Sequence, residues 1–316
     1  MCREKSEGGT WNMAIKNMAA SVLTRLRNQA KKAGINFQTG LQLFFQEEFL
    51  RRLSKSQYRD NMILKGGMFI YTLTEFDSRP TRDMDFMIQR LSNDLNNIQK
   101  TMEEICAVET ENDFVLLQVK GTEQITVDKK YPGVKTKLEG HINNVRVPFS
   151  IDVGIDDVIV PSPVIRKIAT RLDGFTPPEI CTYSLESTIA EKLDAILQRM
   201  ETTSRMKDFF DIYYLSNMFD FDGKTLKEAI QMTSEHRGRV LDKESFERIS
   251  AFATNSFLLT QWKNFEPAKD AVLDFEVTLN RIHEFLEPLV TAIIEKKDYT
   301  KQWSCAERKW EIPLYY

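Results

Sequence analysis

The sequence is poor in the residues that carry histidine, thiolate and disulfide chemistry. Its 316 residues include only four cysteines and three histidines. They are Cys2, Cys106, Cys181, Cys305, His141, His236 and His283. The cysteines are far apart and unpatterned, so they predict neither a zinc site nor a disulfide framework. The histidines do not cluster either, and catalysis by a Ser-His-Asp or Cys-His arrangement has no support.

Long apolar runs and an excess of basic charge are also missing. No apolar stretch approaches the length of a membrane span, and the N-terminus lacks the layout of a signal peptide. We therefore expect a cytoplasmic protein with no membrane partner. The net charge of −3 argues against a protein that coats nucleic acid, so an RNA partner would need a local basic patch. Candidate patches are Arg199, Arg205, Arg237 and Arg239, or Lys296, Lys297, Lys301, Arg308 and Lys309.

Two carboxylates two residues apart are the most informative feature that is present. Asp83 and Asp85 fall in the stretch Arg79-Pro80-Thr81-Arg82-Asp83-Met84-Asp85-Phe86. Side chains alternate along a strand, so both acids would point to the same face. Adjacent carboxylates repel unless a cation neutralises them, which favours a divalent metal, Mg²⁺ or Mn²⁺. The alternative is that the two acids form the solvated face of a half-buried strand.

A glycine turn precedes the two acids by fewer than twenty residues. Residues 62–64 predict a short buried strand, Lys65-Gly66-Gly67 a tight turn, and residues 68–76 a helix. Backbone N–H groups at such a turn, together with the helix N-terminus, can bind the phosphates of an NTP. The alternative is a plain turn whose glycine caps the end of a preceding helix.

A third carboxylate lies on a predicted strand further along the chain. Apolar and polar residues alternate over 145–154, and Asp152 falls on the polar side. If this strand neighbours that of Asp85, three acids converge where metal ions could bind the attacking and leaving oxygens of a displacement reaction. Asp152 could equally be a solvated strand residue.

Two predicted helices carry further charged candidates. Residues 184–197 have an N-cap candidate, Ser184, and an apolar stripe with Lys192 beside it. Lysines near such a stripe usually extend their charge to water. Asp208 and Asp211 lie three apart and share one face of a helix. They could act in catalysis, orient Lys192, or form a surface salt-bridge cluster.

The remaining pattern predicts three parts, namely N-terminal helices over 1–58, an α/β core over 59–170 and a mainly helical C-terminal lobe over 171–316. Proline-rich 161–178 is the best boundary candidate. The stretch 134–139 predicts an exposed strand. The predicted helices are 14–33, 39–55, 94–106, 184–200, 205–218, 224–234, 243–253 and 270–294.

Five motifs, taken in order, resemble the AbiEii/AbiGii nucleotidyltransferase toxins over about residues 35–220. They are Lys65-Gly66-Gly67, Arg79-x-Thr81-x-Asp83-x-Asp85, Ile151-Asp152-Val153, Ala190-Glu191-Lys192-Leu193-x-Ala195 and Arg205-x-Lys207-Asp208-Phe209-Phe210-Asp211-Ile212-Tyr213-x-Leu215. The resemblance implies an α/β fold of the DNA polymerase β-like nucleotidyltransferase type with a mixed sheet. It also implies an enzyme of bacterial toxin–antitoxin and phage-defence (abortive infection) systems.

The same resemblance implies roles for individual residues. Asp83 and Asp85 would bind Mg²⁺, and Asp152 would complete the metal site or act as a base. The triphosphate of the NTP substrate would lie against Lys65, Gly66, Gly67 and Lys192. Asp208 and Asp211 would be catalytic or would orient Lys192. Many relatives have Ser or Thr where this chain has Met68, which leaves a hydroxyl contact to the phosphates without support.

The resemblance further implies transfer of a nucleoside monophosphate to RNA, particularly tRNA, and an antitoxin encoded in the same operon. Two alternatives remain open from the sequence. One is a small-molecule nucleotidyltransferase of the aminoglycoside-modifying type. The other is a non-catalytic NTP-binding interaction module.

Overall fold

The computed structural model describes residues 7–125, 133–155, 157–267 and 272–313. Cys2 and the predicted helix start at residue 270 lie outside these ranges. The chain divides into two compact units, Met1–Asp156 with Val164–Thr182, and Asp157–Pro163 with Tyr183–Tyr316. The boundary expected at residue 170 therefore lies inside a segment of the first unit. The reason is that 164–182 forms a strand hairpin that pairs with the central sheet.

Two helices open the first unit, α1 (Glu7–Lys32) and α2 (Phe37–Lys55). They confirm the two predicted N-terminal helices. The second begins at Phe37 rather than Thr39, because Asn36 is the N-cap and its side chain accepts a hydrogen bond from the Thr39 backbone N–H at 2.8 Å. In α2, the fully buried Glu48 carboxylate accepts hydrogen bonds from Arg51 and Arg52. These charges stay buried because they neutralise one another.

A seven-stranded mixed sheet forms the centre of the first unit, in the order β3-β4-β5-β2-β1-β7-β6. Strand β2 is parallel to β5 and β1 is parallel to β7, whereas the other neighbours are antiparallel. The expected α/β class and mixed sheet are confirmed. The strands are β1 (Met62–Lys65), β2 (Met84–Ile88), β3 (Val115–Ile125), β4 (Gly133–Ile142), β5 (Val145–Gly154), β6 (Val164–Lys167) and β7 (Glu179–Thr182). The other helices of this unit are α3 (Gly66–Leu73) and α4 (Leu95–Ala107).

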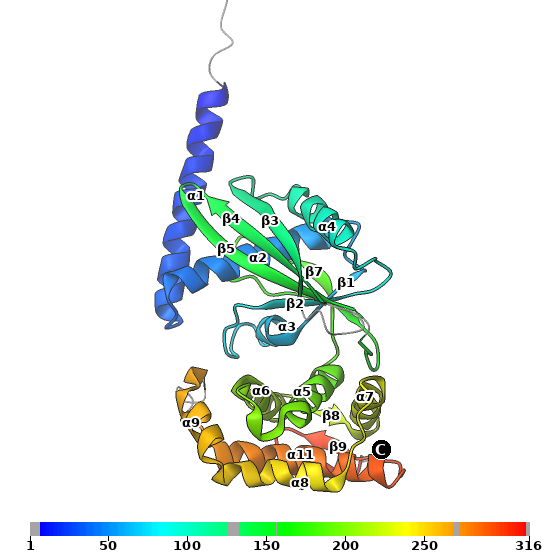
Figure 1. Cartoon of the computed structure of the whole chain (residues 1–316). Coiled ribbons are helices and arrows are strands. Elements are labelled where there is room, and N and C mark those ends of the chain that lie inside the picture. The colour runs from blue at the N-terminus through cyan, green and yellow to red at the C-terminus, as the bar shows by residue number, and fades with distance from the viewer. Residues whose placement is uncertain (1–6, 126–132, 156, 268–271, 314–316) are drawn as a thin grey trace, which may run out of the picture. The chain divides into compact units, whose positions relative to one another are not determined.

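One face of the sheet is apolar and packs against α2 (Figure 1). Phe49 of α2 contacts Phe86 of β2 edge to face, with ring centroids 6.1 Å apart. Phe45 lies so close to Gly140 of β4 that a Cβ there would overlap its ring. The strand expected to be exposed over 134–139 is therefore half-buried, since its alternate residues Val134, Thr136 and Leu138 pack into this layer. The residues that alternate with these along β2, β4 and β5 point to the other face of the sheet.

The second unit is mainly helical, as expected for the C-terminal lobe. Its helices are α5 (Leu185–Arg199), α6 (Met206–Met218), α7 (Gly223–His236), α8 (Lys243–Ser250), α9 (Ser256–Asn264) and α11 (Phe275–Ile294). A small sheet of β8 (Phe221–Asp222), β9 (Gln302–Ser304) and β10 (Lys309–Glu311) adds to them. Trp303 of β9 is buried and donates its indole N–H to the Ser216 carbonyl oxygen at 2.7 Å. This contact packs strand β9 against helix α6.

Candidate active site

The glycine turn joins a buried strand to a helix, as the sequence predicts. Strand β1 ends at Lys65 and α3 begins at Gly66, so the alternative of a glycine that caps a preceding helix is wrong. Gly66 has φ +70°, in the left-handed region, and a Cβ there would overlap the Asp85 carboxylate. A Cβ on Gly67 would lie 3.0 Å from the Thr81 hydroxyl. Gly66 is favoured both by its backbone conformation and by the close Asp85 side chain, and Gly67 by its tight contact with Thr81.

Asp85 and Asp152 are brought together by the pairing of two parallel strands. They are register partners across β2 and β5. Such partners point to the same side of the sheet, here the side opposite the apolar layer on α2. Both residues are partly exposed, and Asp152 follows the predicted alternation of buried and polar positions along β5. On the other side of Asp85, its antiparallel register partner is Lys65.

Asp83 occupies a different position from the other two acids. It precedes the first residue of β2 and is exposed. In the part of the chain that the structure describes, no group of three or more His, Cys, Asp or Glu side chains is arranged to hold a metal ion. The structure thus pairs two of the predicted carboxylates in register and leaves Asp83 at the end of the strand.

The donor chemistry of this pair still fits a hard divalent cation. Carboxylate oxygens are the protein ligands that Mg²⁺ prefers, and it is commonly held by only one or two carboxylates together with substrate phosphates. Asp85 and Asp152 supply two carboxylates from rigid strands, and the Gly66 turn brings backbone N–H groups to the same place. The residues present could therefore hold the cation together with a triphosphate.

A lysine that the sequence motifs do not include contacts the second acid. Lys135 of β4 is the register partner of Asp152. Its Nζ lies 2.7 Å from Asp152 Oδ1 and 3.0 Å from Oδ2. Local sequence could not reveal this residue, since Lys135 is one of two lysines on β4 and its partner is set by pairing between distant strands.

The second unit gathers the other predicted site residues into a buried cluster. Lys192 Nζ of α5 lies 2.5 Å from Asp211 Oδ2 and 3.4 Å from Asp208 Oδ1, both on α6. All three residues are at most 8% exposed. Lys192 therefore does not extend its charge to water, and the acids are not a surface salt-bridge cluster. Asp208 also accepts a hydrogen bond from Arg205 at 2.6 Å. The roles predicted for Asp208 and Asp211, in catalysis or in orienting Lys192, stay predictions.

Most of the first candidate basic patch is neutralised by carboxylates within the second unit. Arg237 binds Asp194 at 2.9 Å, Asp157 at 3.1 Å and Glu191 at 3.3 Å. Arg239 also pairs with Asp194, a buried residue of α5. These arginines serve mainly to connect α5 with the end of α7 and with the 157–163 segment. They do not supply the unpaired positive charge that an RNA-binding surface needs.

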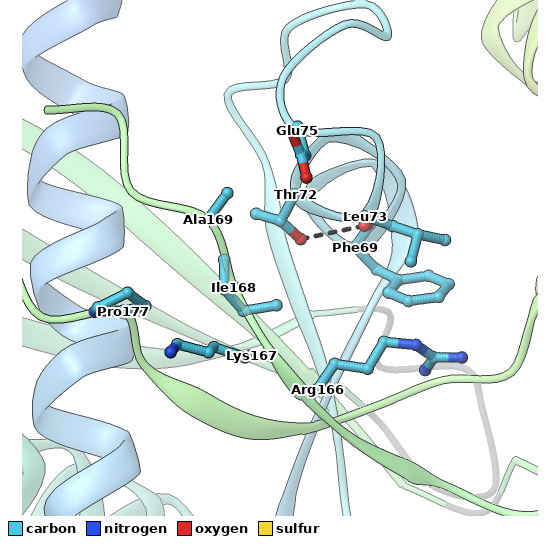
Figure 2. Close-up of a pocket in the computed structure, with 9 residues that line it drawn as sticks. All are labelled: Phe69, Thr72, Leu73, Glu75, Arg166, Lys167, Ile168, Ala169 and Pro177. Carbon is cyan, nitrogen blue, oxygen red and sulfur yellow. Dashed lines mark hydrogen bonds between the residues drawn. The ribbon is translucent and has the colours of Figure 1, made fainter. Parts of the chain in front are cut away.

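A cavity of about 270 Å³ lies in the first unit beside α3 (Figure 2). Phe69 and Thr72 line it from the helix, and Arg166 and Lys167 line it from edge strand β6. Figure 2 shows the Arg166 side chain extending toward Phe69, with its guanidinium carbon 5.4 Å from the ring centroid. The cavity contains none of the predicted site residues.

Comparisons with known proteins bear on the family and the fold of this chain. A family model described as the nucleotidyl transferase AbiEii toxin, type IV TA system, matches residues 48–302. Among solved structures, MenT4, a nucleotidyltransferase toxin from Mycobacterium tuberculosis H37Rv, has a TM-score of 0.50 at 17% identity, over 70% of this chain and 72% of its own. JHP933 from Helicobacter pylori has a TM-score of 0.45 at 15% identity, over 80% of this chain and 97% of its own.

No curated protein sequence matches the chain. Among the residues described by the structure, no helix has the length and apolar character needed to cross a membrane. The family match covers most of the chain, and the likeness to MenT4 shows the fold. The chain belongs to the AbiEii family of nucleotidyltransferase toxins of type IV toxin–antitoxin systems.

Proposed function

We propose that this toxin transfers a nucleoside monophosphate from an NTP to RNA, in a reaction that depends on Mg²⁺ or Mn²⁺. The observation that carries the proposal is the register of Asp85 with Asp152 on parallel strands, next to the Gly66 turn. A divalent cation bound there would neutralise the carboxylates and the triphosphate. Asp83, at the start of the same strand, is proposed as a further ligand.

In this reaction the acceptor hydroxyl oxygen forms a bond to the α-phosphorus of the NTP. The bond from that phosphorus to the oxygen bridging the β-phosphate breaks, and pyrophosphate leaves. The proton of the acceptor hydroxyl passes to a base, for which Asp152 is the candidate among the paired acids. Backbone N–H groups at Gly66 and Gly67 would bind the phosphates, and they need no hydroxyl from position 68.

We further propose tRNA as the acceptor class, a role in arresting growth during phage infection, and an antitoxin encoded beside the toxin gene. Family membership supports the toxin role and the antitoxin. Lys192 as a triphosphate ligand, and catalytic roles for Asp208 and Asp211, also stay predictions. A small open reading frame adjacent to the gene would be the first observation to seek for the antitoxin.

Incubation of the protein with labelled NTPs, Mg²⁺ and total RNA tests the acceptor class. Label in a tRNA-sized band is the expected result. Label that appears only in small molecules would instead support an aminoglycoside-type activity. Nucleotide binding without pyrophosphate release under any of these conditions would support a non-catalytic module.

A further inference from the structure

A lysine lies on each side of the paired carboxylates. Lys65, Asp85, Asp152 and Lys135 form one row across β1, β2, β5 and β4, because each is the register partner of the next. Side chains of directly opposed residues share one face of a sheet. The row therefore places two carboxylates between two ammonium groups, with the four formal charges in balance.

The contact between Lys135 and Asp152 involves both carboxylate oxygens. Nζ lies 2.7 Å from Oδ1 and 3.0 Å from Oδ2, and the two side chains are 28% and 31% exposed. A carboxylate that accepts a hydrogen bond at Oδ2 and lies in ion-pair contact at Oδ1 has a restricted orientation. Partial burial also makes this pair stronger than an ion pair in bulk water.

The same strand offers a matched comparison. Lys137, two residues further along β4 on the same face, binds Glu123 of β3 at 2.7 Å. The distance equals that of the Lys135 pair, but these side chains are 55% and 52% exposed. The register partner of Lys137 on β5 is Ser150, which is not an acid of the proposed site.

We propose that Lys135 is a positioning residue of the nucleotidyltransferase site, which holds the Asp152 carboxylate beside Asp85 and competes with the divalent cation for its oxygens. This inference rests on the proposed function, because it takes Asp85 and Asp152 as metal ligands. A cation that binds Asp152 must take an oxygen from the lysine or bind close to its positive charge. Either event weakens cation binding, so Lys135 sets the cation concentration at which the site fills.

A second consequence concerns the charge that meets the nucleotide. The four residues of the row carry no net charge, and a bound divalent cation makes the row positive. That charge is complementary to a triphosphate. The lysine thus keeps the empty row neutral, and the row becomes attractive to the nucleotide only when the cation binds.

Titration of the full-length protein with Mn²⁺, followed by electron paramagnetic resonance of the free ion, tests the proposal without an activity assay. Lys135→Met removes the charge and keeps the aliphatic stem, and should lower the Kd for Mn²⁺ about tenfold. Lys137→Met should leave the Kd within about twofold of wild type, because its partner is not a ligand. Lys135→Arg keeps the charge and should remain close to wild type. Lys135→Gln serves as a second neutral variant if the methionine variant does not fold.

The outcomes separate the inference from the proposed function. If Asp85→Asn binds Mn²⁺ as wild type does, the proposed metal site is wrong and the inference falls with it. If Asp85→Asn loses the site but Lys135→Met and Lys135→Gln keep the wild-type Kd, only the inference is overturned. Equal tightening by Lys135→Met and Lys137→Met would also overturn it, because the effect would then be general surface charge. Activity assays should show the Mg²⁺ dependence of Lys135→Met shifted to lower concentration.

Discussion

At the scale of single residues, the candidate site depends on backbone positions as much as on acids. Gly66 has φ +70°, and the Asp85 carboxylate occupies the space that a Cβ would take. Gly67 lies less close to Thr81, where an added Cβ would be 3.0 Å from the hydroxyl oxygen. A Cβ at Gly66 would displace the Asp85 carboxylate, and a Cβ at Gly67 would lie tightly against Thr81. The turn and the acids therefore form one structural unit.

Gly66→Ala should destabilise the protein and abolish transfer. The left-handed backbone alone disfavours alanine by roughly 1–2 kcal/mol, and the contact with Asp85 adds to this. The matched control is Gly34→Ala, with φ +67° and no atom within 4 Å of the added Cβ. Urea unfolding and a transfer assay on both variants measure the effects. If both variants lose equal stability and both keep activity, the close approach of Gly66 to Asp85 has no functional role.

Lys192→Ala should destabilise the second unit by about 3–5 kcal/mol, because it leaves Asp208 and Asp211 buried without their shared cation. The structure therefore predicts a much larger effect than a solvated lysine would show. Lys243→Ala is the control, since this lysine is exposed and 3.7 Å from Glu247 on its own helix. Its removal should change the unfolding free energy by less than about 0.5 kcal/mol. Thermal unfolding measures the loss of stability in both variants. A loss in Lys192→Ala as small as that in Lys243→Ala would contradict the burial argument.

At the scale of elements, α2 combines apolar packing with a buried set of charges. Glu48 accepts hydrogen bonds from Arg51 and Arg52 and also from Thr110 and Asn112 at 2.6 Å. Arg52 in turn donates to the Val115 carbonyl oxygen at 2.7 Å, at the start of β3. One glutamate thus connects α2 to the loop that leads into the sheet.

Glu48→Ala should lower the unfolding free energy by about 3–5 kcal/mol, because two buried guanidinium groups lose a shared partner. The control is Glu111→Ala, which removes the partner of Lys55, the last residue of α2. In this ion pair the Lys55 and Glu111 side chains are 39% and 63% exposed. That change should be worth less than about 1 kcal/mol. Comparable midpoints in chemical denaturation for the two variants would show that the Glu48 contacts do not stabilise the unit.

Local pattern predicts much of this fold, and its limits are also visible at this scale. The turn at Lys65-Gly66-Gly67 and the alternation along β5 follow from residue type and spacing alone, and both are confirmed. The sequence pattern does not predict helix α9, since this helix is short and exposes Phe257 instead of showing a clean apolar stripe. Strands β8, β9 and β10 have only two or three residues each, too few to show a period.

Strand neighbours are the main feature that the local pattern does not contain. The alternation around Asp152 shows which face the acid occupies, but the register with Asp85 and Lys135 arises from pairing between distant segments. Lys192 illustrates the same limit, because helical spacing placed it beside the apolar stripe. Its burial depends on the packing of α6, which places Asp208 and Asp211 against it.

At the scale of the whole molecule, the chain combines an α/β unit that carries the paired acids with a mainly helical unit that carries the Lys192 cluster. The segment 164–182 returns to the first unit after 157–163 has joined the second. The chain therefore crosses between the units more than once. Each unit has its own apolar core, built on Phe86 in the first and Phe209 in the second.

Induced expression of the wild-type toxin should arrest bacterial growth, and Asp83→Ala should relieve the arrest. Arrest is expected because an RNA to which a nucleotide has been added could no longer function. Relief is expected because the variant lacks a proposed metal ligand and should not catalyse the transfer. Growth curves after induction, with immunoblots to match protein amounts, measure this. Equal arrest by both proteins would show that toxicity does not depend on nucleotide transfer. No arrest by either would favour a small-molecule substrate.

The most direct test of the central claim is Mg²⁺-dependent pyrophosphate release in the presence of NTP and RNA, measured for wild type and Asp85→Ala. Wild type should release pyrophosphate with Mg²⁺ and not with EDTA. Asp85→Ala should fold, because the carboxylate is only partly buried, and its rate should fall by at least about a hundredfold. Pyrophosphate release by Asp85→Ala at the wild-type rate would contradict the assignment of Asp85 and Asp152 as the metal-binding pair.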